Sequence, residues 1–139
     1  MAADATGAAH AAHAPDTAAA VGARFARSLA AKDAGALKAI LRPDVDFRAM
    51  TPGKFWEASD PDVIVDEMVL GTWFSPERRI TAVLGVETDH VATLDRVGYR
   101  FKVQRPDGEF VIEQQAYYEM DGERISWLRI MCTGFLPVD

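Results

Sequence analysis

The sequence has few of the features that mark several common classes of protein. It contains a single cysteine, Cys132, so no disulfide can form within the chain, and a reducing compartment is expected. Its 15 Lys and Arg residues are outnumbered by 21 Asp and Glu residues, which gives a net charge of −6. Because phosphate binding requires a basic surface, this acidic balance argues against nucleic acid as a partner.

Signals for export or membrane insertion are also missing. The first 15 residues are rich in alanine but contain no Lys or Arg, whereas a secretory signal starts with basic residues and continues with an apolar segment. No later apolar run is long enough to span a bilayer. We therefore predict a cytoplasmic protein with no membrane partner, in which residues 1–15 form a disordered tail and residues 16–139 form one domain.

The three histidines do not predict a metal site. His10 and His13 lie on the predicted tail, where two imidazoles on a flexible chain do not complete a coordination shell. His90 is predicted in a turn, with its side chain exposed. Because metal-ligand spacing and a glycine-rich phosphate loop are both absent from the sequence, we expect neither a metal nor a cofactor.

Three helices are predicted in the first half of the chain. The first begins at residues 15–17, where an oxygen-bearing cap precedes apolar residues spaced by three and four. Asp33 caps a second, short helix that Pro43 is expected to end. Asp60 and Pro61 begin a third, which is expected to end at Gly71.

A short strand is predicted between the second and third helices. Val45, Phe47 and Ala49 alternate with polar or larger residues, which is typical of a strand with one buried face. The breaker residues 51–53 follow this strand, and we assign Phe55 and Trp56 to the loop beyond them.

From Arg79 onward the apolar residues recur at every second position, which predicts four further strands. We expect these at residues 80–86, 91–103, 110–120 and 124–133, with turns at residues 88–90, 105–108 and 121–123. The order helix, helix, strand, helix and four antiparallel strands is an α+β arrangement. A curved sheet wrapped around the helices would leave a hollow between the two layers.

Three segments, taken in order, resemble the nuclear transport factor 2-like superfamily, in particular its SnoaL-like and ketosteroid isomerase-like branches. They are Arg24-Phe25 through Lys32-Asp33-Ala34-Gly35, the strand entry Asp44-Val45-Asp46-Phe47, and Tyr118-Glu119-Met120-Asp121-Gly122 leading to Ile125. The resemblance implies a cone-shaped antiparallel sheet packed on three N-terminal helices, a cystatin-like α+β roll with a cavity, often dimeric. Members include isomerases, cyclases, dehydratases, epoxide hydrolases and binding domains without chemistry, so the fold alone does not determine the function.

Strand alternation predicts which side chains line the hollow. We assign the apolar parity of each strand to the inside, where aromatic walls with a few polar groups are typical of a small-molecule pocket, although ordinary core packing explains the same pattern. Gln114 stands out, because a buried amide must find hydrogen-bond partners, either across the sheet or on a ligand carbonyl or hydroxyl. The predicted pocket residues are Phe25, Phe47, Trp56, Tyr99, Gln114, Ala116, Tyr118 and Cys132.

The resemblance also implies where catalytic groups should lie, and the sequence lacks them there. Ketosteroid isomerase-like enzymes use an aspartate base, a tyrosine and a protonated aspartic acid, and the matching positions here hold Ala49, Phe25 and Ala116. Asp95 and Glu67 remain as weak candidates for an acid or base. Cys132 has no predicted histidine beside it, which argues against a nucleophile activated by a base.

The opposite parity of the last strands forms the outer face of the sheet. Large aromatic residues on such a face suggest that it is covered, and a homodimer is the simplest arrangement that covers it. The residues predicted for this interface are Gln115, Tyr117, Trp127, Arg129 and Met131.

Three functions remain open from the sequence. The first is a SnoaL-like protein that binds a small apolar molecule in the cone, with no established reaction. The second is an isomerase, cyclase or lyase acting on a polyketide- or steroid-like substrate by acid–base chemistry, and the third is a non-catalytic association domain. Whether the chain is an enzyme is left undecided.

Overall fold

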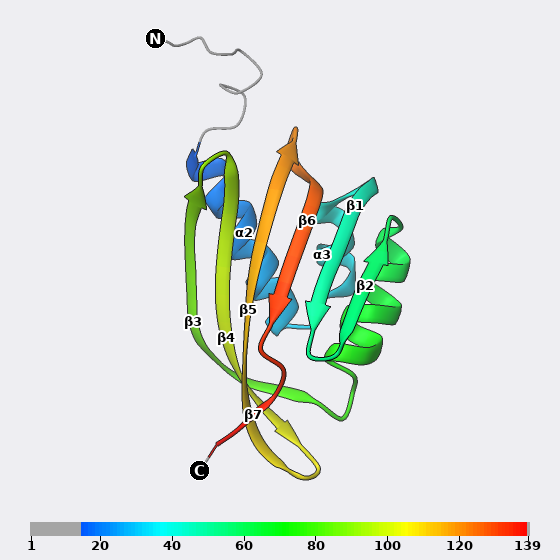
Figure 1. Cartoon of the computed structure of the whole chain (residues 1–139), viewed down its shortest axis with the longest axis vertical. Coiled ribbons are helices and arrows are strands. Elements are labelled where there is room, and N and C mark those ends of the chain that lie inside the picture. The colour runs from blue at the N-terminus through cyan, green and yellow to red at the C-terminus, as the bar shows by residue number, and fades with distance from the viewer. Residues whose placement is uncertain (1–14, 139) are drawn as a thin grey trace.

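The computed structural model describes residues 15–138, which form three helices and one curved sheet (Figure 1). The predicted tail, apart from Pro15, lies outside the described residues, as do His10 and His13. The helices are α2 (Pro15–Ala30), α3 (Ala34–Ile40) and the π-helix η1 (Val63–Trp73). The strands are β1 (Leu41–Thr51), β2 (Lys54–Ala58), β3 (Arg79–Val91), β4 (Leu94–Arg105), β5 (Gly108–Asp121), β6 (Arg124–Cys132) and β7 (Leu136–Pro137).

The strands follow the order β2-β1-β6-β5-β4-β3 across the sheet, and β7 pairs with β5. Helices α2 and α3 lie behind the sheet, and η1 runs beside β2 at its edge (Figure 1). The predicted α+β architecture is confirmed. The sheet is antiparallel except where β1 runs parallel to β6, a pairing that the sequence analysis did not anticipate.

Helix α2 forms where the sequence predicted it, because its apolar positions fall on one side of a 3.6-residue repeat. Ala18, Val21, Phe25 and Leu29 are all at most 4% exposed, and the helix packs against β3 and β4. The helix lies close to the sheet at Gly22, where a side-chain Cβ would overlap the hydroxyl of Tyr118 on β5. Glycine at this position therefore lets the Tyr118 hydroxyl reach the backbone of α2.

Helix α3 is capped as predicted, since Oδ1 of Asp33 accepts a 3.0 Å hydrogen bond from the backbone N–H of Ala36. The prediction that Pro43 ends this helix is wrong, because the helix stops at Ile40 and the chain passes directly into β1. Pro43 lies within β1, between Leu41 and Asp46, where the register against β6 shifts. A break in the ladder accommodates a residue that has no N–H to donate.

The assignment of Phe55 and Trp56 to a loop is also wrong, because both belong to β2. Thr51 pairs with Lys54 across a tight turn made by Pro52 and Gly53, so β1 and β2 form a hairpin. Proline followed by glycine suits the two central positions of such a turn, and the breaker residues connect two paired strands.

The third helix differs from expectation in type and in length. Phe74 donates its backbone N–H to the carbonyl of Val69, five residues earlier, which is the π-helical spacing. The helix passes through Gly71, the predicted end, because a residue without a Cβ can lie against the carbonyl of Asp66. This extra turn carries Trp73 into the core, where it is 4% exposed.

Strand β3 is longer than predicted, because the expected turn at residues 88–90 is part of the strand. Asp89, a turn-forming residue by type, instead pairs with Arg96 on β4, its partner in the strand register. The chain turns later, at Ala92 and Thr93, and His90 is an exposed strand residue.

Candidate functional site

The inner face of the sheet carries the side chains that strand alternation placed there. In the central parts of β4 and β5, every second residue belongs to the buried core and is at most 2% exposed. These are Val97, Tyr99, Phe101 and Val103 on β4, and Ile112, Gln114, Ala116 and Tyr118 on β5.

Aromatic rings fill much of the interior. The ring of Tyr99 stacks on Phe101 with centroids 5.1 Å apart and tilts against Phe25 at 6.3 Å. Phe74 packs edge-on to Phe101 at 6.0 Å. Phe25 and Phe47 are therefore part of the packed core, with exposures of 4% and 1%.

The three positions that would carry proton-transfer groups in a ketosteroid isomerase-like site lie in this core. Phe25, Ala49 and Ala116 are at most 5% exposed. None of these side chains can donate or accept a proton, so the chemistry of that site has no equivalent at these positions.

Among residues 15–138, Gln114 is the one buried polar residue of the sheet's inner face whose hydrogen bonding is incomplete. Its Oε1 accepts a 2.6 Å hydrogen bond from the hydroxyl of Tyr99. Its Nε2 has no partner among residues 15–138, although the side chain is 1% exposed. Burial raises the pKa of Tyr99 well above its ordinary value, and the neighbouring Cys132 adds to this shift, so the phenol stays protonated as the donor.

Tyr118, also predicted in the pocket, has its hydroxyl engaged elsewhere. It donates a 2.7 Å hydrogen bond to the carbonyl of Ala18 on α2. Burial, with a contribution from the charge of Asp95, raises the pKa of this phenol. The group therefore anchors the helix to the sheet.

A pocket of about 370 Å³ opens at the lower end of the sheet in Figure 1, where β6 and η1 end and β1 turns into β2. We call it the mouth pocket. Its wall is mainly aromatic and apolar, with one cation at the rim. It is lined by Thr51, Pro52, Trp56, Thr72, Trp73, Arg78, Ile112, Cys132, Thr133, Gly134 and Phe135.

The two tryptophans of the mouth pocket differ in their hydrogen bonding. They meet edge to face, with ring centroids 5.8 Å apart. The indole N–H of Trp56 donates to Oγ1 of Thr51 at 2.8 Å. The indole N–H of Trp73 is buried and has no partner within the described part of the chain. Trp73, one of the residues that line the mouth pocket, thus carries a hydrogen-bond donor that no residue among 15–138 satisfies and that is itself shielded from solvent.

Arg78, which lines the mouth pocket, and Lys32, which lies outside its lining, hold the neighbouring chain in place. Arg78 donates to the carbonyls of Thr72 and Trp73 at 2.7 and 3.2 Å, which ties down the end of η1. Lys32, whose pKa is lowered by burial, donates to the carbonyls of Ser75 and Arg78 at 2.9 and 2.8 Å. These contacts fix the wall that carries Trp73.

The structure brings only part of the predicted pocket to this site. Trp56 and Cys132 line it. Gln114 is not among the lining residues, but it pairs with Cys132 across β5 and β6 and lies two residues after Ile112, which does line the pocket. The other predicted residues, Phe25, Phe47, Tyr99, Ala116 and Tyr118, lie in the packed core. Sequence reasoning missed Trp73, Arg78 and Phe135, and for Trp73 the misplaced helix end hid the signal.

The weak acid–base candidates do not line the mouth pocket. Asp95 is half-buried near the start of β4, in register with Tyr118. Glu67 is exposed on η1. Within residues 15–138, no three His, Cys, Asp or Glu side chains are grouped so that they could hold a metal ion.

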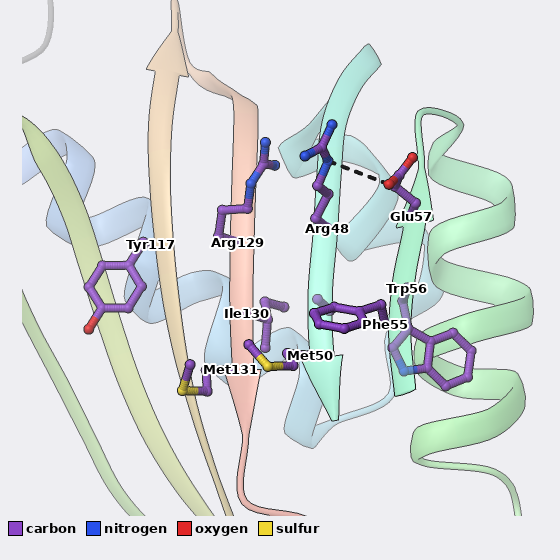
Figure 2. Close-up of a pocket in the computed structure, with 10 residues that line it drawn as sticks. Arg48, Met50, Phe55, Trp56, Glu57, Tyr117, Arg129, Ile130 and Met131 are labelled. Atoms are coloured by element: carbon purple, nitrogen blue, oxygen red, sulfur yellow. Dashed lines mark ion pairs between the residues drawn. The ribbon is translucent and has the colours of Figure 1, made fainter. Parts of the chain in front are cut away.

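A second pocket, of about 360 Å³, lies on the outer face of the sheet, and we call it the outer-face groove (Figure 2). Its floor is formed by Met50, Phe55 and Met131, which are 40%, 79% and 55% exposed. Figure 2 shows Arg48 and Arg129 at one end of this floor, and Tyr117 on β5 with its ring directed away from the floor, toward β4.

The remaining residues of the predicted interface surround this groove. Trp127 is half-buried beneath the guanidinium of Arg129, 4.2 Å from its ring centre, and Arg129 pairs with Asp46 at 3.1 Å. Gln115 accepts a hydrogen bond from Arg96 and donates one to Glu113 at 2.8 Å. The outer face is therefore an apolar patch bordered by paired charges.

None of the helices within residues 15–138 combines the length and the apolar character needed to cross a membrane.

Several solved structures resemble this chain in fold. A nuclear transport factor 2-like protein from Burkholderia thailandensis superposes with a TM-score of 0.60 at 13% identity, over 83% of this chain and 89% of that one. An epoxide hydrolase of the LEH-like type from M. tuberculosis gives 0.61 at 13% identity, over 85% and 84% of the two chains. A steroid delta-isomerase from Pseudomonas aeruginosa gives 0.58 at 20% identity, over 84% and 79%.

The chain therefore has the nuclear transport factor 2-like fold. No protein-family model and no curated protein sequence matches the chain. At identities of 13 to 20%, the likeness to the three structures above concerns the fold alone.

Proposed function

We propose that the protein binds a small, mostly apolar molecule in the mouth pocket, and that this molecule carries a hydrogen-bond acceptor. The observation that carries the proposal concerns Trp73, which lines the pocket and whose indole N–H, buried from solvent, has no partner among residues 15–138. An unsatisfied buried donor costs about 1–3 kcal/mol. A ligand oxygen that accepts this hydrogen bond would recover that free energy.

The chemistry of the unsatisfied groups restricts the ligand. An indole N–H can only donate, and the free end of the Gln114 amide is its NH₂ group, which also donates. Of the two residues only Trp73 lines the mouth pocket, and its N–H calls for an acceptor such as a carbonyl or hydroxyl oxygen. The aromatic wall of Trp56, Trp73 and Phe135 favours an apolar body for the rest of the molecule.

Binding is better supported than acid–base catalysis. An isomerase, cyclase or lyase needs a group that exchanges protons with the substrate, and neither Asp95 nor Glu67 lines the mouth pocket. The hydroxyls of Tyr99 and Tyr118 are engaged within the protein, and burial raises the pKa of each.

Isothermal titration calorimetry with a matched pair of probes tests the proposal. Naphthylbutanone has an apolar body and one carbonyl, and butylnaphthalene has the same body without the carbonyl. We expect the ketone to bind more tightly, and Trp73→Phe, which removes the indole N–H, to abolish most of the difference. Equal affinity of wild type for both probes, or no binding of either, would contradict the proposal.

We also propose that the outer-face groove mediates self-association into a homodimer. The support is the exposed apolar floor of Met50, Phe55 and Met131, which is unusual for a surface that faces water. Two ion pairs, Arg48 with Glu57 and Arg129 with Asp46, place both signs of charge beside the apolar floor. A surface that carries both signs suits contact with a second copy of itself. Multi-angle light scattering at micromolar concentration that shows only monomer would reject this arrangement.

The cytoplasmic location also remains a proposal. It rests on the single cysteine, Cys132, which is a free thiol.

A further inference from the structure

Among residues 15–138, Arg78 is the only charged residue that lines the mouth pocket. Its side chain is half-buried, so it is sheltered but still accessible. Its Nη1 donates to the carbonyls of Thr72 and Trp73 at 2.7 and 3.2 Å, and its Cζ lies 4.9 Å from the ring centre of Phe135. All three of these neighbours line the pocket as well. The charged end of Arg78, and not only its aliphatic stem, therefore belongs to the pocket wall.

No carboxylate in the described part of the chain forms an ion pair with Arg78. A second arginine on the same aromatic ring shows the contrast. Arg105 lies 5.3 Å from the ring centre of Phe135, outside the pocket lining, and pairs with Asp107 at 2.8 Å. The hydrogen bond from Arg105 is the main cause that lowers the pKa of Asp107, and the charge of Arg78 contributes less. The positive charge that faces the pocket is thus the one without an acidic partner.

The hydrogen bonds of Arg78 occupy only part of its guanidinium. The group has five N–H donors in a fixed planar fork. Both bonds to backbone carbonyls start from Nη1, so the N–H groups of Nε and Nη2 have no partner among residues 15–138. Nε and Nη2 lie along one edge of the fork, and two parallel N–H donors of this kind match the two oxygens of a carboxylate.

A second cation adds positive charge close to Arg78. Nζ of Lys32 donates to the carbonyl of Arg78 at 2.8 Å and to that of Ser75 at 2.9 Å, and within the described ranges Lys32 also has no ion pair. No Asp or Glu among residues 15–138 lines the mouth pocket. In a chain with a net charge of −6, this is a local excess of positive charge, which favours an anionic ligand.

We propose that the ligand of the mouth pocket is a mostly apolar carboxylic acid, bound as its carboxylate by the guanidinium of Arg78. This inference deepens the proposed function and rests on it, because the ligand occupies the same pocket and its acceptor is now specified as a carboxylate oxygen. The apolar body of the acid lies against the aromatic wall of Trp56, Trp73 and Phe135.

A carboxylate fits this pocket better than a phosphate. A phosphate monoester carries between about 1.5 and 2 negative charges at neutral pH, whereas the pocket lining offers one guanidinium. The net charge of −6 makes the remaining negative charge unfavourable. A carboxylate carries a single charge, which one guanidinium balances, and its planar shape suits the fork of Arg78.

Isothermal titration calorimetry of the full chain tests the charge and the neutral acceptor separately. Naphthylbutanoate has an apolar body and a carboxylate, and naphthylbutanamide has the same shape and a carbonyl acceptor without the charge. The quantity of interest is the carboxylate preference, defined as the Kd of the amide divided by the Kd of the acid. It is measured at low and at high ionic strength, because salt weakens the interaction between accessible charges.

We expect the acid to bind wild type about tenfold more tightly than the amide at low ionic strength, with a smaller preference at high ionic strength. Arg78→Gln should remove the preference and leave the affinity for the amide within about threefold of wild type. Arg78→Lys keeps the charge without the planar fork and should retain part of the preference. Arg79→Gln is the matched control, because it removes the same charge at an adjacent, exposed position outside the lining, and it should leave the preference unchanged.

Equal affinity of wild type for the acid and the amide at low ionic strength would overturn the proposal. A full preference that persists in Arg78→Gln, with amide binding retained, would overturn it as well. If Arg78→Gln does not fold, the preference of wild type and its decrease with salt decide the matter.

The outcome also separates the two levels of the argument. If naphthylbutanone binds more tightly than butylnaphthalene but the acid binds no more tightly than the amide, the carboxylate is rejected and the binding function stands. If none of the probes binds, both are rejected.

Discussion

The hydroxyl of Tyr99 and the amide of Gln114 form a 2.6 Å hydrogen bond between neighbouring strands, with both residues at most 2% exposed. Tyr99 satisfies one end of the amide, and the other end has no partner in the part of the chain that the structure describes. The pair joins the packed core of the cone to the mouth pocket, because Gln114 is also the cross-strand partner of Cys132.

This pair should be strongly coupled in stability. Tyr99→Phe leaves both ends of the Gln114 amide without a partner, so the free energy of unfolding should fall by roughly 1–3 kcal/mol. Adding Gln114→Leu removes the amide that Tyr99→Phe leaves without a partner. The double variant should therefore regain part of the lost free energy of unfolding. Urea unfolding of wild type, both single variants and the double variant measures this coupling. Strictly additive losses would show that the bond contributes nothing beyond its separate partners.

The buried phenols should make the protein sensitive to high pH. The ordinary tyrosine pKa is 10.0, and burial raises the pKa of both Tyr99 and Tyr118 in the folded state. Their contribution to stability is therefore complete below about pH 10 and is lost as the pH rises above that value, because the unfolded chain releases these protons first. Urea unfolding at several alkaline pH values should show a shallower loss of stability for Tyr99→Phe than for wild type. If stability falls with pH equally steeply in wild type and Tyr99→Phe, the raised pKa of Tyr99 is contradicted.

Gly22 should be intolerant of a side chain. Alanine normally favours a helix over glycine by about 1 kcal/mol, but a Cβ here would displace the Tyr118 hydroxyl and press against Val97. We expect Gly22→Ala to lower the free energy of unfolding by roughly 1–3 kcal/mol. Gly35→Ala is the matched control, because Gly35 is exposed in α3 and a Cβ there would make only an ordinary 3.7 Å contact with Oδ1 of Asp33; it should be neutral or stabilising. A stabilised Gly22→Ala would show that the helix does not approach the sheet as closely as described.

The outer-face groove should respond to a buried charge. If two copies meet there, Met131→Glu places like charges in an apolar contact and should weaken the dimer by about tenfold or more. Val91→Glu, at an apolar residue that is 52% exposed on β3, is the control and should leave the association unchanged. Light scattering across a concentration series measures both variants. If Met131→Glu associates as wild type does, the interface lies elsewhere.

The sequence was sufficient to predict the fold and the inner face because the periodicity of its strands is regular. Alternation alone placed Tyr99 and Gln114 on the buried side of β4 and β5. The spacing of three and four in α2 and the Asp33 cap likewise depend only on residues close in sequence. Local patterns of this kind report which face of an element is buried.

The candidate site was harder to predict, because it depends on where elements end. Trp73 was placed beyond the third helix, since Gly71 is a common helix terminator, and only the π-helical packing of Gly71 against Asp66 carries the helix further. Phe47 and Phe25 were expected to line a hollow, but their rings pack against other aromatic residues. Volume left between packed rings is a tertiary property that periodicity does not encode.

The central claim is that the indole N–H of Trp73 donates a hydrogen bond to an acceptor on the bound ligand. Two-dimensional NMR of the indole N–H groups tests it most directly, with Trp73→Phe used to assign the signal. We predict that naphthylbutanone shifts the Trp73 signal downfield, that butylnaphthalene produces no such shift, and that the Trp127 signal stays in place. A Trp73 signal that responds equally to both probes, or to neither, would contradict the account.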